Sequence, residues 1–490
     1  MSSVIGHLSF VIFKRIDGFA ETLNPPVMSN TVPPYLALRS LSLLVSENLI
    51  LTACLLAAVQ IRLFTSAGEL QRYEHPIFKA FLISLVFQAV LHLLDIYIFP
   101  KTATHGEFFA RLGAALLCAA TLLSLIFYNL PDFVAGRGIL LTALLLGSIF
   151  LTLWHTLLRV YIGTRVPRIR ILVVGTGHLA RELVREVIRH PELDIKVCGF
   201  VDSNPQLLGV SLVNPKVIGL VKDLSALVSQ HKASKVIVEM QDRRGCLPTS
   251  ELLKLKIRGI SIDDATTLYE RLTGKIAIEN LKPSWMIFNS GFEVSGRLLL
   301  VKQIVSTFVS LLLLILFSPI MLLVMGLIKL ESLVPIFFKQ ERVGRDGKLF
   351  TLWKFRSMRA DAERESGPVW AEENDHRVTR LGKFLRRTRL DEIPQLWNVL
   401  RGDMSLVGPR PERPFFVNQL AEKIPFYQLR HTVKPGVTGW AQINYHYGNS
   451  FQDSVEKLQF DLFYLKHMSV FLDLLIIIET IKTVLVRKGS

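Results

Sequence analysis

Two adjacent carboxylates, Asp391 and Glu392, stand in the arginine-rich stretch 386–411, which is RRTRLDEIPQLWNVLRGDMSLVGPRP. Adjacent acids repel each other, so their place among arginines needs a physical reason. Guanidinium groups bind phosphate oxygens, while one carboxylate can hold a metal ion and another can act as a nucleophile or base. A solvated helix face with salt bridges is the alternative interpretation. The stretch therefore raises the hypothesis of a site that handles phosphate groups.

Neighbouring motifs fit the same hypothesis. Lys354 and Arg356 alternate in a predicted strand, so both are expected on one face, where two cations can hold a diphosphate or contact a lipid surface. Arg410 lies between two prolines, whose fixed φ makes a stiff mounting for a planar, bidentate donor. The apolar period of residues 379–402 predicts a helix whose regular extent Pro394 limits.

The composition indicates a membrane protein. Half of the 490 residues are apolar and the mean hydropathy is +0.37, which is too hydrophobic for a purely soluble chain. The formal charge of +16 suits cytoplasmic loops and anionic lipid. No zinc-finger, homeodomain or RNA-binding signature occurs in the sequence, so no nucleic-acid partner is expected. The four cysteines lack metal-ligand spacing and are interpreted as reduced, structural thiols.

After a poorly patterned tail at 1–35, four apolar runs predict four transmembrane helices within 36–164. Each run approaches the ~20 residues that a bilayer-spanning helix needs. Four buried helices of a soluble domain are the alternative. Arginines follow the fourth run closely, which places that side of the membrane in the cytoplasm. The runs lie near 43–64, 77–99, 108–128 and 138–161, and the arginines are Arg159, Arg165, Arg168 and Arg170.

Strands alternate with helices in 165–296, which predicts a Rossmann-like α/β domain with a parallel sheet and a connecting segment. Gly175, Gly177 and Ala180 match the G-x-G-x-x-A pattern of a dinucleotide-binding turn. Asp202 stands further along the chain than a ribose-binding acid usually does. A bound nucleotide is one interpretation, and small residues that merely close a strand–helix turn are the favoured one.

The apolar run within 297–334 is interrupted by Ser318 and Pro319. Proline removes a hydrogen bond and clashes with the preceding turn, so a helix must kink or break there. A kinked fifth span would place the following region outside, whereas a re-entrant helix would keep both flanks inside. The residues alone leave these two open. The last region, 335–490, is expected to be a mainly helical α/β catalytic domain that ends in an interfacial helix, with a buried terminal helix as the alternative.

Taken together and in this order, the motifs resemble one family, the bacterial polyisoprenyl-phosphate hexose-1-phosphate transferases. Four spans and a Rossmann-like domain resemble the long form found in exopolysaccharide synthesis. ERLTGKIAIENLKPSWMIFNSGF resembles the connecting segment of an exosortase-associated subgroup. The resemblance rests on Ser318-Pro319, FKQERVG, WKFRSM, RLGKFLRRTRLDEIPQLWNVLRGDMSLVGPRP and KPGVTGWAQIN.

The resemblance implies an enzyme of the bacterial inner membrane, an undecaprenyl-phosphate sugar phosphotransferase whose catalytic domain faces the cytoplasm. It implies that Asp391 attacks the β-phosphate of a UDP-sugar donor, releases UMP and forms an aspartyl-phosphosugar. Undecaprenyl phosphate then takes the hexose-1-phosphate. Glu392 would help to hold Mg²⁺, and Ser318-Pro319 would form the break of a re-entrant helix. Substrate binding is assigned to Lys354, Arg356, Arg386, Pro409, Arg410, Pro411 and Arg430.

Further partners and rival functions complete the expectations. A homodimer and contacts with other exopolysaccharide proteins are expected. A membrane-bound nucleotide-sugar dehydratase would need a Tyr-x-x-x-Lys pair, but that spacing occurs at Tyr97–Lys101, with a proline inside it. A sensor or scaffold would need the acid pair to be lost, whereas both acids are present. Glucose-1-phosphate and galactose-1-phosphate are the leading candidates for the transferred group, with N-acetylated hexoses behind them.

Overall fold

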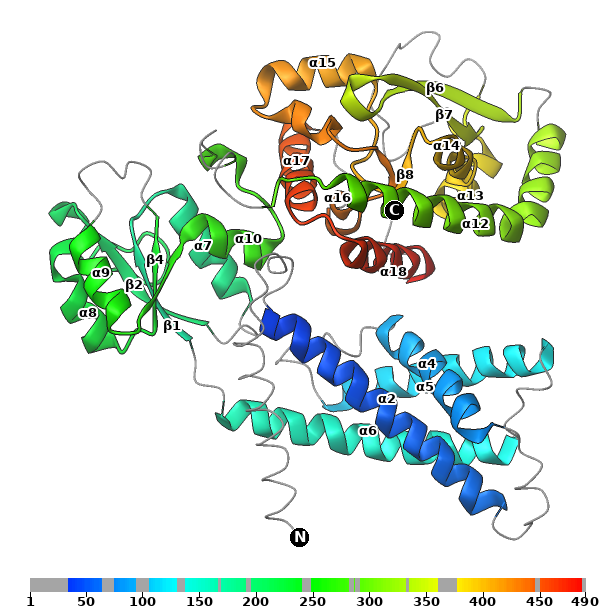
Figure 1. The fold of residues 1–490 in the computed structure, drawn as a ribbon, viewed down its shortest axis with the longest axis horizontal. Helices are drawn as coiled ribbons and strands as arrows, with labels where there is room; N and C mark the ends of the chain where they lie inside the picture. The colour runs from blue at the N-terminus through cyan, green and yellow to red at the C-terminus, as the bar shows by residue number, and fades with distance from the viewer. Residues whose placement is uncertain are drawn as a thin grey trace. The chain divides into compact units, whose positions relative to one another are not determined.

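The computed structural model describes most of the chain after the N-terminal tail. The described residues form, in chain order, a helical bundle, an α/β domain and a C-terminal region of helices and short strands (Figure 1). Most of the tail, the Tyr97–Lys101 pair and Cys246 lie outside the described residues. Those described are 34–63, 75–93, 105–129, 137–165, 169–190, 195–239, 248–281, 286, 291–331, 335–359, 377–445 and 450–486.

The described part of the bundle contains four long helices, one for each apolar run of the sequence. Their common core is built from apolar side chains of all four helices, among them Leu55, Phe87, Ala119 and Leu151. Small residues such as Ala58, which is fully buried, let helices approach one another closely. The helices are α2 (Pro34–Leu63), α4 (Pro76–Leu93), α5 (His105–Asn129) and α6 (Arg137–Arg165).

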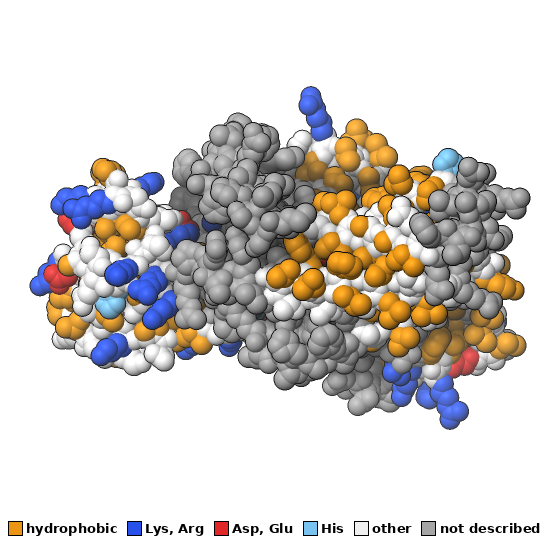
Figure 2. All heavy atoms as spheres, turned by 90° about the horizontal axis from the view of Figure 1, so that it is seen from below, with side chains coloured by type: hydrophobic (Ala, Val, Ile, Leu, Met, Phe, Trp, Pro, Cys, Tyr) orange, Lys and Arg blue, Asp and Glu red, His pale blue; other side chains and the backbone are white. Residues whose placement is uncertain are grey.

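Apolar side chains also cover the outside of the bundle. On α6, five residues at a spacing of four are each more than half exposed, so they form one stripe along the helix. Figure 2 shows hydrophobic side chains gathered over the helices, whereas Lys and Arg are prominent on the visible face of the α/β domain. Such a stripe is unfavourable in water and suits contact with lipid. Its residues are Leu141, Leu145, Ile149, Leu153 and Leu157.

The number of spans in the bundle stays a prediction. Among the described residues, Gly138–Leu157 of α6 and the later helix α12 (Gly296–Glu331) are long and apolar enough to cross a bilayer. Three further apolar stretches of the bundle are shorter: Val45–Ile61, Pro76–Leu91 and Gly113–Ser124.

The α/β domain contains a five-stranded sheet, and its helices alternate with the strands as the sequence predicts. β2 and β3 pair in parallel. The last four residues of β1 are buried, which is typical of a central strand covered on both faces. In sheet order the strands are β3 (Val217–Leu220), β2 (Ile195–Asp202), β1 (Ile169–Val174), β4 (Lys235–Val238) and β5 (Ser261–Asp264). The helices are α7 (His178–Arg189), η3 (Pro205–Leu207), η4 (Val221–Asp223), α8 (Leu224–His231), α9 (Thr249–Ile257) and α10 (Ala265–Thr273).

The C-terminal region is mainly helical and contains two small pairs of strands. β6 (Phe337–Val343) and β7 (Leu349–Phe355) form an antiparallel hairpin, while β8 (Ser405–Val407) and β9 (Gly436–Thr438) pair in parallel. The remaining elements are η5 (Ile278–Asn280), α12, η6 (Arg345–Gly347), α13 (Arg380–Arg387), η7 (Leu390–Glu392), α14 (Gln395–Arg401), α15 (Pro414–Lys423), η8 (Tyr427–His431), α16 (Trp440–Asn444), α17 (Phe451–Lys466) and α18 (Val470–Val486).

Both ends of α12 pack against this region. Near its beginning, Lys302 Nζ lies 2.7 Å from the carboxylate of Asp473. Near its end, Ile328 packs with Phe355. A straight helix of 36 residues would be roughly 50 Å long. Figure 1 shows that the ribbon of α12 instead changes direction along its length.

Ser318 and Pro319 explain how α12 bends without being split. Pro319 lies inside the helix and has no N–H to donate to the carbonyl of Ile315. Ser318 Oγ donates to that same carbonyl over 2.7 Å, so the acceptor is satisfied. The sequence predicts a kink or a break at this position, and the backbone stays helical through it.

The last helix, α18, combines the two alternatives that its sequence allows. Leu472 and Ile476 are buried in a cluster that also contains Leu313 of α12. Three of its other apolar side chains, Phe471, Leu474 and Ile481, are at least half exposed. One side of α18 is therefore buried, as one interpretation of the sequence expects. For the exposed apolar side, we still expect a location at the membrane interface.

Candidate active site

The helix predicted around the acid pair is two short helices with a turn between them. α13 ends at Arg387, and Arg389 then adopts the left-handed conformation with φ 58°. A residue other than glycine adopts this conformation at a cost. The turn leads into Leu390–Glu392, and Pro394 precedes α14. The period of 379–402 marks the helical residues correctly but hides the turn that carries both acids.

Glu392 is surrounded by cationic side chains. Its Oε1 lies 2.8 Å from Lys354 Nζ, 3.1 Å from Arg410 Nη2 and 3.9 Å from Arg389 Nη1. Burial alone would raise the pKa of the Glu392 carboxyl, but these three cations together hold that pKa well below its usual range. Glu392 is therefore a carboxylate throughout the physiological pH range.

Asp391 has the opposite environment. It is 6% exposed, and its Oδ1 accepts no hydrogen bond from the residues that the structure describes. Burial raises the pKa of the Asp391 carboxyl, and the charge of Glu392 raises it further, while Lys354, Arg386 and Arg389 oppose the rise. The two neighbouring acids are thus pushed in opposite directions, which is the arrangement expected when paired carboxyl groups have different tasks.

The other predicted basic residues divide into those that face the acids and those that bond elsewhere. Lys354 on β7 contacts Glu392 directly, and Arg386 on α13 lies close enough to influence Asp391 while its Nε donates to Ser357 Oγ over 2.9 Å. Arg356 follows the end of β7, and its Nε donates to Pro335 O over 2.9 Å. Lys354 and Arg356 thus bond to different partners, although alternation predicts a shared face.

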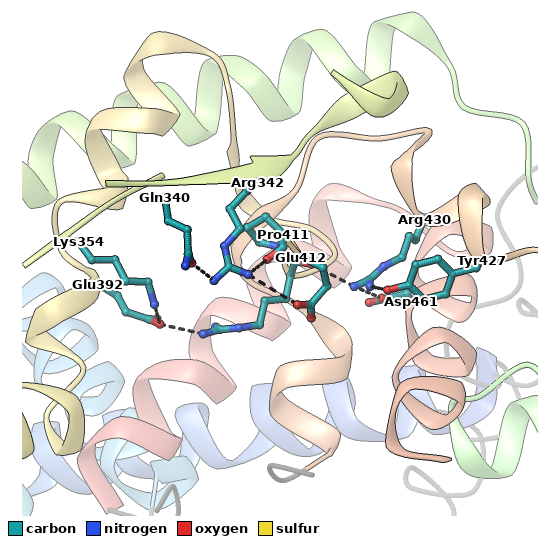
Figure 3. A network of polar contacts seen from close by, with 10 residues as sticks. Gln340, Arg342, Lys354, Glu392, Pro411, Glu412, Tyr427, Arg430 and Asp461 are labelled. Atoms are coloured by element: carbon teal, nitrogen blue, oxygen red, sulfur yellow. Dashed lines mark hydrogen bonds and ion pairs between the residues drawn. The ribbon is translucent and has the colours of Figure 1, made fainter. Parts of the chain in front are cut away.

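The Pro-Arg-Pro segment presents Arg410 to the acid pair. Its guanidinium reaches Glu392, while the carbonyls of Pro409 and Pro411 accept hydrogen bonds from other parts of the chain. Figure 3 shows Lys354 and Glu392 at one end of a polar network that continues to Arg430.

Arg430 lies at the buried end of this network, 5% exposed. It donates to Tyr427 Oη over 2.7 Å and to Arg410 O over 3.0 Å, and it lies 2.8 Å from the carboxylate of Asp461. Sequence reasoning missed Tyr427, Asp461 and the turn residue Arg389. For Asp461 a signal exists, because it is a single acid within the aromatic run FDLFY of α17.

The glycine turn of the α/β domain is filled by a side chain of the domain itself. Gly177 N donates to Glu239 Oε2 over 3.0 Å, and a Cβ atom on Gly175 or Gly177 would collide with Glu239. Thr176 Oγ1 donates to Asp202 Oδ2 over 2.6 Å, so the acid at the end of β2 is hydrogen-bonded within the domain. The packing of Glu239 accounts for both glycines, in line with the favoured interpretation of the sequence, and a nucleotide at Gly175, Gly177 and Ala180 stays the untested alternative.

A metal ion at the acid pair would depend on its substrate for ligands. Among the described residues, no group of three or more His, Cys, Asp or Glu side chains is arranged to hold a metal. Mg²⁺ needs fewer protein ligands, since it is commonly held by one or two carboxylates together with phosphates and water. The unpartnered, buried Oδ1 of Asp391 beside the ionised Glu392 fits that requirement.

Comparisons with known proteins identify the relatives of this chain. Residues 297–487 match the bacterial sugar transferase family. UDP-N-acetylgalactosamine-undecaprenyl-phosphate N-acetylgalactosaminephosphotransferase of Aeromonas hydrophila is 40% identical over 249 residues, 49% of this chain and 56% of that protein. UDP-glucose:undecaprenyl-phosphate glucose-1-phosphate transferase of Escherichia coli is 43% identical over 201 residues, 40% and 43% of the two chains. The chain thus spans about half the length of these two relatives.

A shorter relative is matched almost completely. The exopolysaccharide production protein PSS of Rhizobium leguminosarum is 40% identical over 197 residues, which are 39% of this chain and 97% of that protein. The acid pair, Lys354 and Arg410 all lie within the matched family segment. By these matches, the chain belongs to the bacterial sugar transferase family.

Proposed function

We propose that the protein transfers a hexose-1-phosphate from a UDP-sugar to undecaprenyl phosphate and releases UMP, the initiating step of exopolysaccharide synthesis. The observation that carries this proposal is the acid pair, in which Asp391 keeps a buried, unpartnered oxygen beside a Glu392 surrounded by cations. The names of the Aeromonas and Escherichia relatives, which specify a UDP-sugar and undecaprenyl phosphate, support the choice of both substrates.

In the first step, the unpartnered oxygen of Asp391 attacks the β-phosphorus of the UDP-sugar. An O–P bond forms while the bond from that phosphorus to the bridging oxygen breaks, and UMP leaves with the electron pair of the broken bond. A carboxylate is a weak nucleophile toward a diphosphate that carries two negative charges. Lys354, Arg389 and Arg410 supply a fixed positive field that favours the attack and stabilises the leaving UMP.

In the second step, an oxygen of undecaprenyl phosphate attacks the phosphorus of the aspartyl-phosphosugar. The bond from Asp391 to phosphorus breaks, and the carboxylate is regenerated. A covalent intermediate divides the transfer into two half-reactions and gives ping-pong kinetics. This division suits a site whose donor arrives from water and whose acceptor arrives from the lipid.

Mg²⁺ is the proposed cofactor. When bound, it would supply positive charge to the diphosphate oxygens. Glu392 would hold it together with substrate phosphates. Lys354 and Arg410 keep Glu392 ionised, so that its carboxylate is ready to serve as a ligand.

We also propose a multi-pass inner-membrane protein whose C-terminal region faces the cytoplasm, where UDP-sugars occur. The contacts of both ends of α12 with that region support a helix that enters and leaves the same leaflet. A spanning helix would separate its ends by the bilayer thickness of ~30 Å.

A cysteine at Lys348, an exposed residue that directly precedes β7, tests this topology. In a background without the native cysteines, an impermeant thiol reagent should label it in inside-out vesicles and leave it unlabelled in intact spheroplasts. Labelling in spheroplasts would instead make α12 a fifth span.

A UMP-release assay over a panel of UDP-sugars tests the reaction itself. The panel should contain UDP-glucose, UDP-galactose and their N-acetylated forms, each with and without undecaprenyl phosphate. We expect at least one sugar to give lipid-dependent turnover with Mg²⁺ present. Absence of UMP with every donor, from protein that is folded and embedded in lipid, would contradict the proposal.

A further inference from the structure

Four successive backbone carbonyls around Arg410 are each held by a different donor. Pro409 O accepts from Gly436 N over 2.9 Å, and Arg410 O accepts from Arg430 Nη2 over 3.0 Å. Pro411 O accepts from Arg342 Nη1 over 3.1 Å, and Glu412 O accepts from Val343 N over 3.0 Å. Figure 3 shows the side-chain part of this arrangement.

The sequence explains why the carbonyls are used. Proline has no N–H, so Pro409 and Pro411 offer no backbone donor. Backbone hydrogen bonds at these two residues can therefore form only at their carbonyl oxygens. The carbonyl of Arg410, which lies between the two prolines, accepts instead from a charged side chain that is itself buried. Arg430 is therefore the donor through which side-chain chemistry reaches the backbone of Arg410.

Arg430 is held by two partners of its own. Tyr427 Oη accepts from Nη1, and the carboxylate of Asp461, which is almost completely buried, neutralises the guanidinium. A buried charge is costly unless it is paired and hydrogen-bonded, and this one has a counter-ion and two hydrogen-bond acceptors. At 5% exposure and with these contacts, Arg430 has little surface to offer a phosphate of the substrate.

We propose that Arg430, supported by Asp461 and Tyr427, is a positioning residue that fixes the backbone of Arg410 so that the Arg410 guanidinium meets Glu392. The proposal rests on the proposed function, because its effect is expressed through UMP release. The sequence predicts that Arg430 contacts the substrate directly. In this proposal Arg430 acts instead through the position of Arg410. Asp461 and Tyr427 thereby join the residues on which the reaction depends, although they lie behind the site.

The chemistry of arginine makes this role specific. Its planar fork donates to several acceptors at once, whereas a lysine is a single point charge with a different reach. Arg430→Lys should therefore keep the ion pair with Asp461 and lose the simultaneous bond to Arg410 O. Arg410 would then sample orientations away from Glu392, and a small displacement of a charged group at a reacting centre lowers the rate strongly.

A double-mutant cycle of Arg410→Ala, Arg430→Lys and the combined variant tests the proposal. The quantity is kcat/KM for the UDP-sugar, measured by UMP release. We expect Arg430→Lys to lower it by roughly 10- to 100-fold in the wild-type background and by less than about 3-fold when Arg410 is already alanine. An undiminished loss in the Arg410→Ala background would show that Arg430 acts on the substrate directly and would overturn the proposal.

Two further variants keep the test decisive. If Arg430→Lys does not fold, Tyr427→Phe removes one hydrogen bond from the same guanidinium, and its smaller loss should also vanish in the Arg410→Ala background. Arg401→Lys, an exposed arginine paired with Asp403, is the matched control and should leave kcat/KM unchanged. If the wild-type protein releases no UMP, the proposed function fails; if it does and the cycle is additive, the positioning role alone fails.

Discussion

A buried carboxylate occupies both the place where the sequence predicts a phosphate site and the glycine turn where a nucleotide is the less favoured interpretation, yet the two places are built differently. In the C-terminal region, three cationic side chains satisfy Glu392, and Oδ1 of its neighbour Asp391 accepts no hydrogen bond from any described residue. In the α/β domain, Glu239 itself accepts the hydrogen bond from Gly177 N that a phosphate would use. The acid pair thus keeps the Asp391 oxygen available for reaction, whereas in the glycine turn the Glu239 carboxylate occupies the position that a bound anion would take.

The difference shows what a motif can and cannot establish. A G-x-G-x-x-A turn demands small residues, but a close carboxylate of the same chain imposes that demand as well as a pyrophosphate does. An acid pair among arginines is more informative. The sequence shows which charged groups are present, and only their arrangement in space has to come from the structure. We therefore expect substitutions in the two places to have separable effects, one on the reaction and the other on stability.

Asp391→Asn should have the largest effect. An amide cannot replace the carboxylate nucleophile, so UMP release should fall by at least about a thousand-fold with or without lipid. Asp346→Asn is a matched control, since Asp346 is an exposed acid paired with Arg345 on the same region. Near-normal UMP release by the Asp391 variant would contradict the view that the acid pair, unlike the glycine turn, carries the reaction.

Lys354→Met and Glu392→Gln should move the pH profile in opposite directions. The positive charge of Lys354 lowers the pKa of Asp391 and the negative charge of Glu392 raises it. Asp391 must be ionised to attack, so activity is lost as pH falls through its pKa. Loss of Lys354 should shift this acid limb of kcat/KM to higher pH, and loss of Glu392 should shift it to lower pH.

Both variants should also lower the rate, by roughly 100-fold, because each disturbs the charges at the reacting centre. Lys348→Met, at an exposed lysine of the same hairpin, serves as the control. An acid limb that stays in place in both variants would show that Asp391 is not the group that titrates.

Gly177→Ala should affect stability and leave the reaction nearly unchanged. Its Cβ would collide with the Glu239 carboxylate, at a cost of about 1–3 kcal/mol typical of overpacking. Thermal unfolding measures this loss, which should shrink when Glu239 is also replaced by alanine. A several-fold change in UMP release per folded protein would instead couple the turn to the active site.

The smallest effect expected is a gain in stability from Asp391→Asn. Burial raises the pKa of Asp391 above its value in the unfolded chain, so the ionised form costs stability at neutral pH. Asparagine removes that cost, and Tm should rise by a few degrees at pH 7. The gain should disappear below about pH 4, where the carboxyl of an unfolded chain is also protonated. A lower Tm at pH 7 would contradict the unfavourable burial of the ionised Asp391 carboxyl group.

The sequence predicts the parts of this molecule that are local in the chain. Alternating strands and helices predict the parallel sheet, and the clustering of acids and arginines predicts the association of Glu392 with Arg410. Lys354 is predicted as a basic strand residue, but its pairing with Glu392 depends on how β7 packs beside the turn.

Long-range burial is what the sequence does not reveal. Arg430 looks like one more cation near a glycine loop, and only packing against α17 makes it a buried partner of Asp461. Likewise, no glycine or asparagine marks the left-handed conformation of Arg389 in the sequence. Glu239 lies 62 residues beyond Gly177, and only the sheet brings the two together.

The central claim is that Asp391 carries the phosphosugar between donor and acceptor. Protein mixed with UDP-sugar and Mg²⁺ in the absence of undecaprenyl phosphate should release about one UMP per active site. Rapid denaturation and peptide mass spectrometry should then find one hexose-phosphate adduct on the peptide that contains Asp391. UMP release that strictly requires the lipid, with no adduct on that peptide, would contradict the account.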